Sequence, residues 1–491
     1  MIAAPDFPDI DWANEDVGRL AEIFSERFDV MVQKKDETID GLVEENKQQA
    51  DEIKRQADEI KQLKQEIERL KAAGGRRTRR SRSYNAREFK DYPRPEEHSK
   101  RRRPPDTGIN ESMTHTIQKT AILKYCPGCG GRMPESGVGY DRTTEDAING
   151  RWTKTKWKVI RHYCKACDRQ YSASPEGVLP GEHFGINVMS QVSCMRCLAI
   201  PHEKIGKIIH MLYGRFIEVS NVIHLCDTVA DQLKPLYDGL LERLADAHII
   251  NGDDTGWYHN KMHWHTWAFL TAHIALFHIS PSRSKAVAEA ILEGFEGIII
   301  GDSHSSWNYI GSEAQRCLLH YFRDMYLTLR KNGSAEFRAF FEELHGILKT
   351  AISAWITHGE QDRQVPRHIV DGLPNRIDGL TAGSYTDKDC IRYVKRLRRE
   401  RNQLFTFLEH DGVTYHNNPA ERVLRIFALM RKVCYGSRSI RGIQTTEILT
   451  TIYSTCELRG IDPYRFMVDY LGGRLKSIPM PERQACTAAA A

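Results

Sequence analysis

The sequence contains no uninterrupted apolar run near the roughly 18 residues that a membrane-spanning helix needs. It has no apolar segment behind a basic start, which is the pattern of a secretory signal. It also lacks a strong net charge, because 70 Lys and Arg face 65 Asp and Glu. These absences argue against a membrane protein and an exported one, so we expect a soluble cytoplasmic protein. Its 491 residues suggest about three domains at roughly 150 residues each.

Cysteine, in contrast, is present in a pattern that favours metal binding over disulfides. Six of the 12 cysteines form three Cys-x-x-Cys pairs, which in a reducing compartment indicate a metal site. Between the first two pairs lie 34 residues that include the alternating stretch of a hairpin. We predict a zinc-ribbon-like module over residues 121–175, with one structural Zn²⁺ held by Cys126, Cys129, Cys164 and Cys167. The alternative is four reduced thiols without metal.

The third pair, Cys194 and Cys197, has no partner pair and lies in a helical, Met-rich stretch. We interpret these two side chains as packed, buried thiols.

Residues 39–70 carry a seven-residue repeat typical of a coiled coil. Its two series are Ile39, Asn46, Ile53, Ile60, Ile67 and Leu42, Gln49, Gln56, Leu63, Leu70. Ile in one series and Leu in the other favour a parallel dimer, and a lone Asn fixes the register. We predict that residues 1–73 form an N-terminal helix and a coiled coil through which the chain self-associates. A single solvated helix is the alternative, because two Gln residues weaken the seam.

The next segment, residues 74–120, is predicted to be a basic disordered linker. Residues 76–103 hold 12 Lys and Arg against four acids, a net charge of +8. Prolines accompany these charges, and such a composition does not fold by itself. A run of this kind is either a solvated segment or an arm that neutralises DNA phosphates. We predict an arm with DNA contacts from Arg76, Arg77, Arg79, Arg80, Arg101, Arg102 and Arg103.

Residues 176–246 are predicted to be helical and to contain a helix-turn-helix. Pro201 opens one helix, whose apolar face is formed by Ile205, Ile208, Ile209 and Leu212. Gly214 ends it, and Ser220 is a candidate cap for the next helix. Two helices joined by a short Gly-containing turn fit a DNA-binding motif, although helical pairs are also common in protein cores.

From residue 247 the pattern changes to α/β. Strand-like runs near 247–252, 264–273 and 275–280 precede a helix near 284–294 and a short buried strand that ends at Asp302. This order is that of a ribonuclease H-like catalytic core, which we assign to residues 247–320. Residues 321–415 are predicted to be a helical insertion. Residues 416–475 return to the core, and residues 476–491 form a tail.

Three acids are candidates for one catalytic centre. Asp253 and Asp302 close predicted core strands, and Glu421 lies just inside a helix that Pro419 opens. Strand transfer at a phosphodiester needs an activated oxygen, a stabilised leaving oxygen and neutralised phosphate charge. Two Mg²⁺ or Mn²⁺ ions about 4 Å apart supply all three, and carboxylates are their preferred protein ligands. Asp253, Asp302 and Glu421 are therefore predicted to be both the catalytic residues and the magnesium ligands.

These segments together resemble the insertion sequence 66 family of DDE transposases. The matching stretches are Asp253-Asp-Thr-Gly-Trp257, Pro281-Ser-Arg283, Gly301-Asp302, Gln315-Arg-Cys-Leu-Leu-His320, Asn417-Asn-Pro-Ala-Glu-Arg422 and Arg431-Lys-Val-Cys-Tyr-Gly-Ser-Arg-Ser439. The resemblance implies the triad named above, a prokaryotic, nucleoid-associated protein, and small accessory proteins encoded nearby as partners. The family usually has Glu where this chain has Asp254, which as a strand neighbour of Asp253 is expected to point the other way.

Further residues are assigned auxiliary roles. Cys317 and His320 resemble a motif that follows the second Asp in several DDE families, and His320 is expected to orient DNA or a carboxylate. The alternative is a buried Cys and a helix-capping His. Contacts to phosphates near the third acid are predicted from Arg422, Lys432, Arg438 and Arg441. Three further histidines, His259, His263 and His265, lie on a hairpin that we expect to be exposed. They have no Cys or acid at ligand spacing, so we do not favour a metal site there.

The sequence thus predicts a DNA transposase that binds the ends of a mobile element and catalyses metal-dependent strand cleavage and strand transfer. Two alternatives stay open. One is a domesticated DNA-binding regulator without catalysis, and the other is a ribonuclease H-like nuclease that cuts without joining. Neither membrane nor lipid is expected among its partners.

Overall fold

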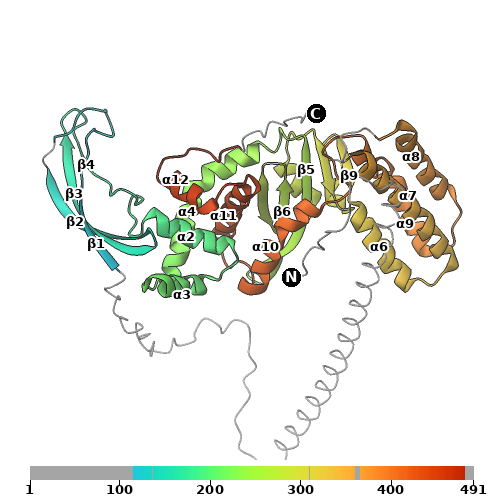
Figure 1. The fold of residues 1–491 in the computed structure, drawn as a ribbon, viewed down its shortest axis with the longest axis horizontal. Coiled ribbons are helices and arrows are strands. Elements are labelled where there is room, and N and C mark those ends of the chain that lie inside the picture. Colours follow the sequence, from blue (N-terminus) through green and yellow to red (C-terminus); the bar gives the residue numbers. More distant parts are fainter. Residues whose placement is uncertain (1–113, 135–136, 309, 360–364, 481–491) are drawn as a thin grey trace, which may run out of the picture. The chain divides into compact units, whose positions relative to one another are not determined.

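The computed structural model describes residues 114–134, 137–308, 310–359 and 365–480 (Figure 1). Two mixed sheets and, within these ranges, eleven α-helices make up the fold, which confirms the predicted α/β class in outline. The predicted coiled coil and the arginine-rich arm lie outside the described residues. Of the helices described, none combines the length and the apolar character needed to span a bilayer.

The first sheet is built on a long hairpin. Its strands are β1 (Thr114–Ala121), β2 (Val138–Ile148), β3 (Arg151–Cys164) and β4 (Arg169–Ser172). β2 and β4 pair with β3 in antiparallel fashion, and β1 pairs with it in parallel. Trp157 and Val159 of β3 are buried, but the buried face switches parity at Ile160, so Tyr163 is half exposed. The alternating pattern therefore marks a real strand but not one continuous buried face.

Residues 114–120 are part of this sheet, so the predicted disordered linker extended too far. They form most of β1, whose pairing with β3 runs from Thr114 opposite Trp152 to Ala121 opposite Val159. The strand is polar and largely exposed, and only Ala121 at its end is buried. Backbone pairing to a distant strand, rather than an apolar pattern of its own, stabilises this segment, and composition does not reveal such pairing.

Three helices follow the first sheet: α2 (Ile186–Cys197), α3 (His202–Tyr213) and α4 (Val219–Glu242). α3 begins after Pro201 and ends at Gly214, whose φ of 67° closes the helix, as predicted. The predicted cap at Ser220 is wrong. α4 starts at Val219, so Ser220 lies inside the helix and Glu218 is the residue at the N-cap. Leu212 was placed on the buried face of α3 but is 44% exposed.

The second sheet has the strand order β7-β6-β5-β8-β9. Its strands are β5 (Ile249–His259), β6 (Met262–Leu270), β7 (Ala275–Ser280), β8 (Ile298–Gly301) and β9 (Glu313–Arg316). β5, β6 and β7 form an antiparallel meander, whereas β8 and β9 join β5 in parallel. Helix α5 (Lys285–Ile291) connects β7 to β8. The predicted order of three strands, a helix and a strand ending before Asp302 is confirmed.

Helix α11 (Ile440–Leu458) covers the free edge of β7. The backbone N–H groups of Ala275, Phe277 and Ile279 donate to side chains of Thr455, Thr451 and Glu447, respectively. Four residues of a helix advance about 6 Å and two residues of a strand about 6.6 Å. The side chains of α11 and the N–H groups of β7 therefore stay in register over these three hydrogen bonds. An edge that would otherwise present unpaired N–H groups is thereby closed.

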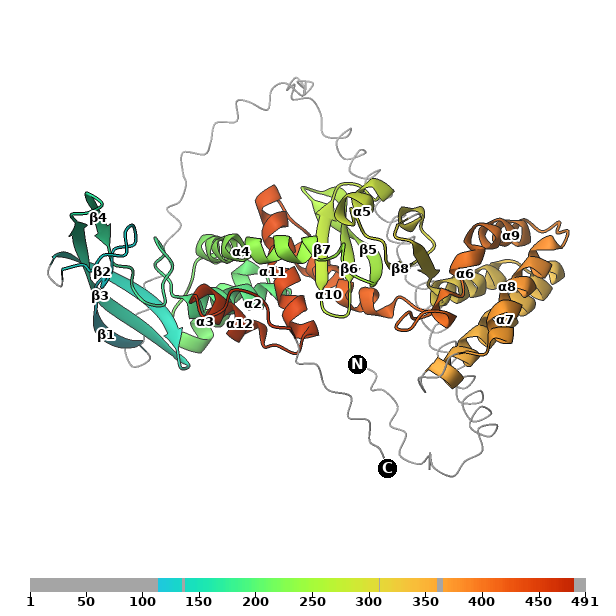
Figure 2. The same ribbon diagram turned by 90° about the horizontal axis from the view of Figure 1, so that it is seen from above.

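The opposite edge, β9, is covered by the end of the helical insertion. The insertion contains α6 (Leu318–Lys331), α7 (Ala335–Gly359), α8 (Arg367–Ala382) and α9 (Lys388–Glu400). After α9 the chain returns to the sheet, where Gln315 of β9 contacts the backbone of Leu404 and Phe407. Figures 1 and 2 show α4 and α11 beside β7 and the insertion helices beyond β9.

One hydrophobic cluster joins the helices α2–α4 to the second sheet. It runs from Trp152 in β3 through Val188 in α2 and Leu233 in α4 to Ile250 in β5. Helices α11 and α12 (Pro463–Leu471) contribute to the same cluster. Cys197 is buried in it and Cys194 lies against it, close to Met467, as the packed-thiol interpretation predicted.

Candidate active site and metal centre

Asp253 lies in the middle of β5, not at the end of a strand as the sequence suggested. β5 continues to His259 because it pairs with β6 along its whole length up to a tight turn at Asn260 and Lys261. β8 pairs with β5 only as far as Asn251. Asp253 is therefore placed just beyond the point where the parallel neighbour ends.

Asp302 directly follows β8, so it reaches the same region from the neighbouring strand. Its Oδ1 accepts a hydrogen bond from the backbone N–H of His304 at 2.9 Å, and its backbone carbonyl accepts one from Arg316 at 2.8 Å. The fully buried ring of Trp307 packs against Gly252, where an added Cβ would lie 2.4 Å from the ring. Glycine before Asp253 thus allows the Asp302 loop to approach β5 closely.

Glu421 comes from helix α10 (Asn418–Cys434), in its first turn and two residues after Pro419. α10 packs on the meander through Phe427, whose ring lies 5.7 Å from that of Trp257 and 4.7 Å from that of Phe277. This packing sets α10 against β5 and β6 (Figure 1).

Asn417, immediately before α10, ties three segments together and has no exposed surface. Its side chain donates to the carbonyl of Gly252 at 2.8 Å and accepts from the amide of Asn251 at 3.0 Å. Its backbone N–H donates to the Cys317 thiol at 3.2 Å, and its carbonyl accepts from the N–H of Glu421 at 3.2 Å. No role was predicted for Asn417 from the sequence, although its place in the motif before Glu421 could have indicated one.

The electrostatics of Asp253 show that the acids share one neighbourhood. Burial and the negative charges of Asp302, Asp254 and Glu421 raise the pKa of Asp253 to about 7, although the backbone N–H of Asp254 opposes the shift. A carboxylate that is buried among other carboxylates is stable only if a cation or a proton compensates it.

The compact metal-ligand set that contains Glu421 is not formed by the three acids. Among the described residues, Glu421 groups with Cys317 and His320, whose ligand atoms lie within 4.8 Å of one another. His320 Nε2 is 3.5 Å from a Glu421 oxygen, and burial lowers the pKa of His320, so its ring is neutral near pH 7. Like charges keep the acids apart, and His320 faces the carboxylate that it was predicted to orient.

Asp254 has a different environment from its neighbour. Its side chain is 3% exposed and accepts from Arg283 Nε at 2.8–2.9 Å, with His265 Nδ1 at 3.4 Å. A guanidinium therefore compensates Asp254, while no basic side chain is paired with Asp253 among the described residues. Arg283 belongs to the matched Pro281–Arg283 stretch, but sequence reasoning did not connect it to Asp254.

Of the three histidines of the β5–β6 hairpin, His263 is exposed as predicted, whereas His259 and His265 are not. His259 is 6% exposed and packs on Trp264 with ring centroids 4.8 Å apart, because the loop after α10 covers the hairpin through Ser437. His265, contrary to expectation, has an acid within reach, namely Asp254.

The basic residues predicted to contact DNA near the third acid are dispersed. Arg422 is exposed beside Glu421. Lys432 and Arg438 are exposed at or beyond the far end of α10, with Lys432 roughly 16 Å along the helix from Glu421. Arg441 is paired with Asp231 at 2.7 Å and with Asp227 at 3.8 Å, so α4 already engages its guanidinium.

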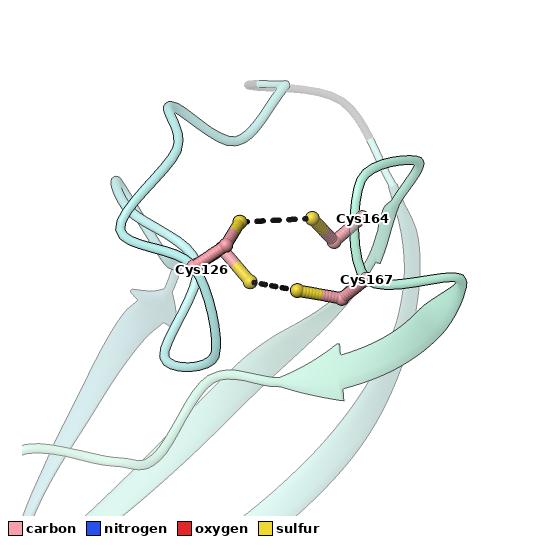
Figure 3. Close-up of side chains that lie close together, drawn as sticks. Cys126, Cys164 and Cys167 are labelled. Atoms are coloured by element: carbon pink, nitrogen blue, oxygen red, sulfur yellow. Dashed lines mark hydrogen bonds between the residues drawn. The ribbon is translucent and has the colours of Figure 1, made fainter.

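The four paired cysteines meet at one point at the end of the first sheet (Figure 3). Cys126 and Cys129 lie in the loop after β1, and Cys164 and Cys167 lie where β3 turns into β4. The Sγ atoms of Cys126 and Cys167 are 3.7 Å apart, and those of Cys129 and Cys164 are 3.6 Å apart. Four thiolates around Zn²⁺ at 2.3 Å would be about 3.8 Å apart, so the donor set fits zinc. All four cysteines are free of disulfides.

The thiols also have the electrostatics of a ligand set. Desolvation opposes ionisation of Cys126, but hydrogen bonds from the backbone N–H groups of Cys129 and Gly128 and from neighbouring thiols lower its pKa to about 6. The hydrogen bonds with Cys129 and Cys126 raise the pKa of Cys167 to about 12, so the set holds both a readily ionised thiol and a protonated one. Zn²⁺ binds thiolates rather than thiols, so its uptake would displace the proton of Cys167.

Curated relatives of this chain come from Sinorhizobium fredii (strain NBRC 101917 / NGR234). The chain is 24% identical over 277 residues to uncharacterized protein y4jD, covering 50% of this chain and 53% of the relative. It is 31% identical over 97 residues to uncharacterized protein y4jO, covering 20% of this chain and 29% of the relative. It is 21% identical over 395 residues to uncharacterized protein y4hP, covering 70% of each chain. The match thus spans about half of the first relative and less than a third of the second.

A family model described as "Transposase IS66 family" matches residues 183–445. The matched segment includes the second sheet, the helical insertion and all three candidate acids. Since it covers more than half of the sequence, the chain belongs to the IS66 family of transposases.

Proposed function

We propose that this protein is a DDE-type DNA transposase that binds the ends of its mobile element, cuts a strand there and transfers it to target DNA. The observation that carries the proposal is the raised pKa of Asp253, since it results from burial and from the negative charges of Asp302, which follows the adjacent strand, and Glu421, which lies in a distant helix. The strand order, in which an antiparallel meander is extended by two parallel strands, supports a ribonuclease H-like core.

The residues fit a pair of Mg²⁺ or Mn²⁺ ions. All three donors are carboxylates, and Asp253 is half-buried among negative charges without a basic partner in the described structure. Bound there, such ions activate the attacking oxygen, stabilise the leaving oxygen and neutralise the phosphate. The Cys126, Cys129, Cys164 and Cys167 set fits one structural Zn²⁺ and supports the proposed zinc-ribbon module.

The chain's own residues prepare this site in three ways. Asn417 fixes the start of α10, which carries Glu421, against β5, which carries Asp253. His320, neutral near pH 7, contacts Glu421 without adding a competing positive charge. Arg283 compensates Asp254 and thereby leaves Asp253 as the uncompensated acid of β5.

We assign DNA binding to the zinc module, the α3–α4 helix pair and the arginine-rich arm. Self-association is assigned to the repeat at residues 39–70, and small accessory proteins are proposed as further partners. Light scattering on a peptide of residues 31–73 tests the self-association: a dimer supports it, and a monomer across the micromolar range contradicts it.

The decisive experiment is Mg²⁺-dependent cleavage and joining of a labelled element end. Alanine at Asp253, Asp302 or Glu421 is expected to reduce both reactions by about 10³-fold or more, since several kcal/mol of metal stabilisation are removed. Binding of the end in a gel shift should persist. Asp254→Ala is the matched control and should retain substantial activity, because Asp254 pairs with Arg283.

Each alternative has its own outcome in this assay. If all four variants cut like the wild type, the active site lies elsewhere. Cleavage without joining would identify a nuclease. Specific binding without either reaction in the wild type would identify a DNA-binding regulator.

A further inference from the structure

The solvent-facing side of α9 carries a line of basic residues that the proposed function leaves unexplained. Lys388, Arg392, Lys395 and Arg399 are all exposed and follow one another at intervals of four, three and four residues. Such spacing places them along one face of a helix. The opposite face, with Tyr393 and Leu397, is buried in the core of the insertion. We refer to these four residues as the α9 stripe.

The stripe borders an open hollow of about 430 Å³ with a consistently basic wall. Its lining consists of Lys388, Ile391, Arg392, Lys395, Arg396 and Arg399, without a carboxylate. Lys388 and Lys395 have no ion pair with any described residue. A hollow of this composition would attract an anion, and the positions of its charges indicate an extended anion rather than a single phosphate.

The guanidinium groups of the hollow are held in place by acids and two of them also by aromatic rings. Arg392 pairs with Asp389, and Arg396 and Arg399 pair with Glu400. Arg396 stacks over Tyr321 at 3.7 Å from the ring centroid, and Arg392 stacks over Tyr393 at 4.6 Å. Asp324 accepts from both, at 3.0 Å from Arg396 and 3.4 Å from Arg392. Side chains that are already ordered lose less entropy when they bind a ligand.

The helix that carries the stripe is also bonded to Ser303, the residue after Asp302. Arg396 Nη2 donates to Ser303 Oγ at 2.5 Å, and Ser303 follows Asp302 in the chain. Buried Glu400, at the end of α9, accepts from the same hydroxyl at 3.0 Å. α9 is thus fastened to the loop that presents the second acid, although the two are about 90 residues apart in sequence.

We infer that the α9 stripe binds the phosphate backbone of the DNA whose strand enters the active site. This inference rests on the proposed function. From Lys388 to Arg399 the stripe spans about 16 Å, which corresponds to the axial rise of about five base pairs of duplex DNA at 3.4 Å each. The helical insertion then serves as a guide for the DNA, and its contact is independent of base sequence because it reaches only phosphates.

The test compares two double variants of the full-length chain. Lys388→Ala/Lys395→Ala removes the two unpaired charges of the stripe. Arg338→Ala/Lys349→Ala removes two exposed charges from α7 in the same insertion. Affinity for a duplex carrying the element's terminal repeat is measured as a function of KCl, and melting temperatures verify that both variants are folded.

We expect the slope of log affinity against log salt to fall in magnitude by about 1.8 for the stripe variant, about 0.9 for each lost phosphate contact. The α7 variant should keep the wild-type slope. Cleavage by the stripe variant should be restored at saturating DNA, since the acids are intact.

Two outcomes overturn the inference while the proposed function stands. One is an unchanged slope in the stripe variant while the wild type binds and cuts. The other is a change in oligomeric state with an unchanged slope, which would make the stripe a protein interface. If the wild type itself neither binds nor cuts element ends, the proposed function fails together with the inference.

Discussion

The four-thiol cluster and the three-acid cluster are two ligand sets assembled in opposite ways. The thiols come from two short loops of one sheet and already lie 3.6–3.7 Å apart across the cluster. The acids come from β5, β8 and α10, and 118 residues separate the last two in the sequence. Burial and the neighbouring negative charges raise the pKa of Asp253 to about 7, whereas hydrogen bonds from backbone N–H groups and thiols lower that of Cys126 to about 6 against its desolvation.

The difference supports the proposal that the thiols form a structural centre and the acids a reactive one. The thiol cluster is preformed and favours permanent occupancy, because thiolates at tetrahedral distances need no rearrangement to hold Zn²⁺. The acid cluster keeps an uncompensated, half-protonated carboxyl in a buried place, which is a feature of functional sites. The predictions that follow test this contrast from its largest expected effect to its smallest.

The largest effect is expected from Cys164→Ser. Removing one of four thiolates should lower zinc affinity by several orders of magnitude and destabilise the β3–β4 turn, because zinc binding contributes to folding. Metal analysis should find about one zinc per wild-type chain and none in the variant. Asp302→Ala is the control and should retain its zinc. A Cys164→Ser protein with full zinc content would contradict the four-thiol site.

Asn417→Ala is expected to reduce Mg²⁺-dependent cleavage by 10- to 100-fold, the usual effect of losing a residue that positions metal ligands. The side chain bridges β5 and α10, so its loss should weaken the apparent affinity for Mg²⁺ more than the rate at saturating Mg²⁺. A Mg²⁺ titration of the cleavage rate separates the two. The neighbouring Asn418→Ala serves as the control. An equal fall in rate at all Mg²⁺ concentrations would contradict positioning.

The raised pKa of Asp253 predicts an opposite pH dependence for the metal-free and the Mg²⁺-loaded protein. An acid whose pKa is higher in the folded chain binds more protons there, so metal-free stability should fall as pH rises from about 4 to about 7. Mg²⁺ needs the carboxylate, so stabilisation by Mg²⁺ should grow over the same range.

Asp253→Asn should remove both trends and stabilise the metal-free protein at pH 8 by up to about 4 kcal/mol, the free energy of three pKa units. Thermal melting with and without Mg²⁺ at several pH values provides the measurement. A variant no more stable than the wild type at pH 8 would contradict this prediction. It would mean that a group outside the described structure compensates the charge of Asp253.

The smallest effect is expected from Asp254→Asn. Its charge is one of several that raise the pKa of Asp253, so its loss should shift the acidic limb of the pH–rate profile down by less than about one unit. The maximal rate should stay within a few-fold of the wild type. A loss as large as that of Asp253→Ala would mean that Asp254 is the ligand and Asp253 its neighbour.

Local patterns in the sequence were sufficient for much of the molecule. The Cys-x-x-Cys spacing identified four thiols that do meet, and the order of apolar runs predicted β5 to β8 and α5. Pro201 and Gly214 marked the ends of α3. In each case the residues that carry the pattern lie within a few positions of the element or site that they predict. Over such short distances, spacing and backbone preference decide which structure forms.

Boundaries that depend on distant partners were predicted less well. β1 was assigned to the linker, because its pairing with β3 leaves no apolar pattern. Asp253 was placed at a strand end, whereas pairing with β6 carries β5 on to His259. Leu212 was expected to be buried, but the neighbours of α3 leave it exposed.

The sequence by itself determined which groups could do chemistry: four thiols at knuckle spacing and three acids in recognisable motifs. Only the tertiary structure decided how they are used. Asn417 meets Gly252 across 165 residues, Arg283 takes the charge of Asp254, and α11 closes the edge of β7. These contacts depend on the packing of α10, α11 and the insertion against one sheet, and local patterns carry no record of which distant surfaces meet.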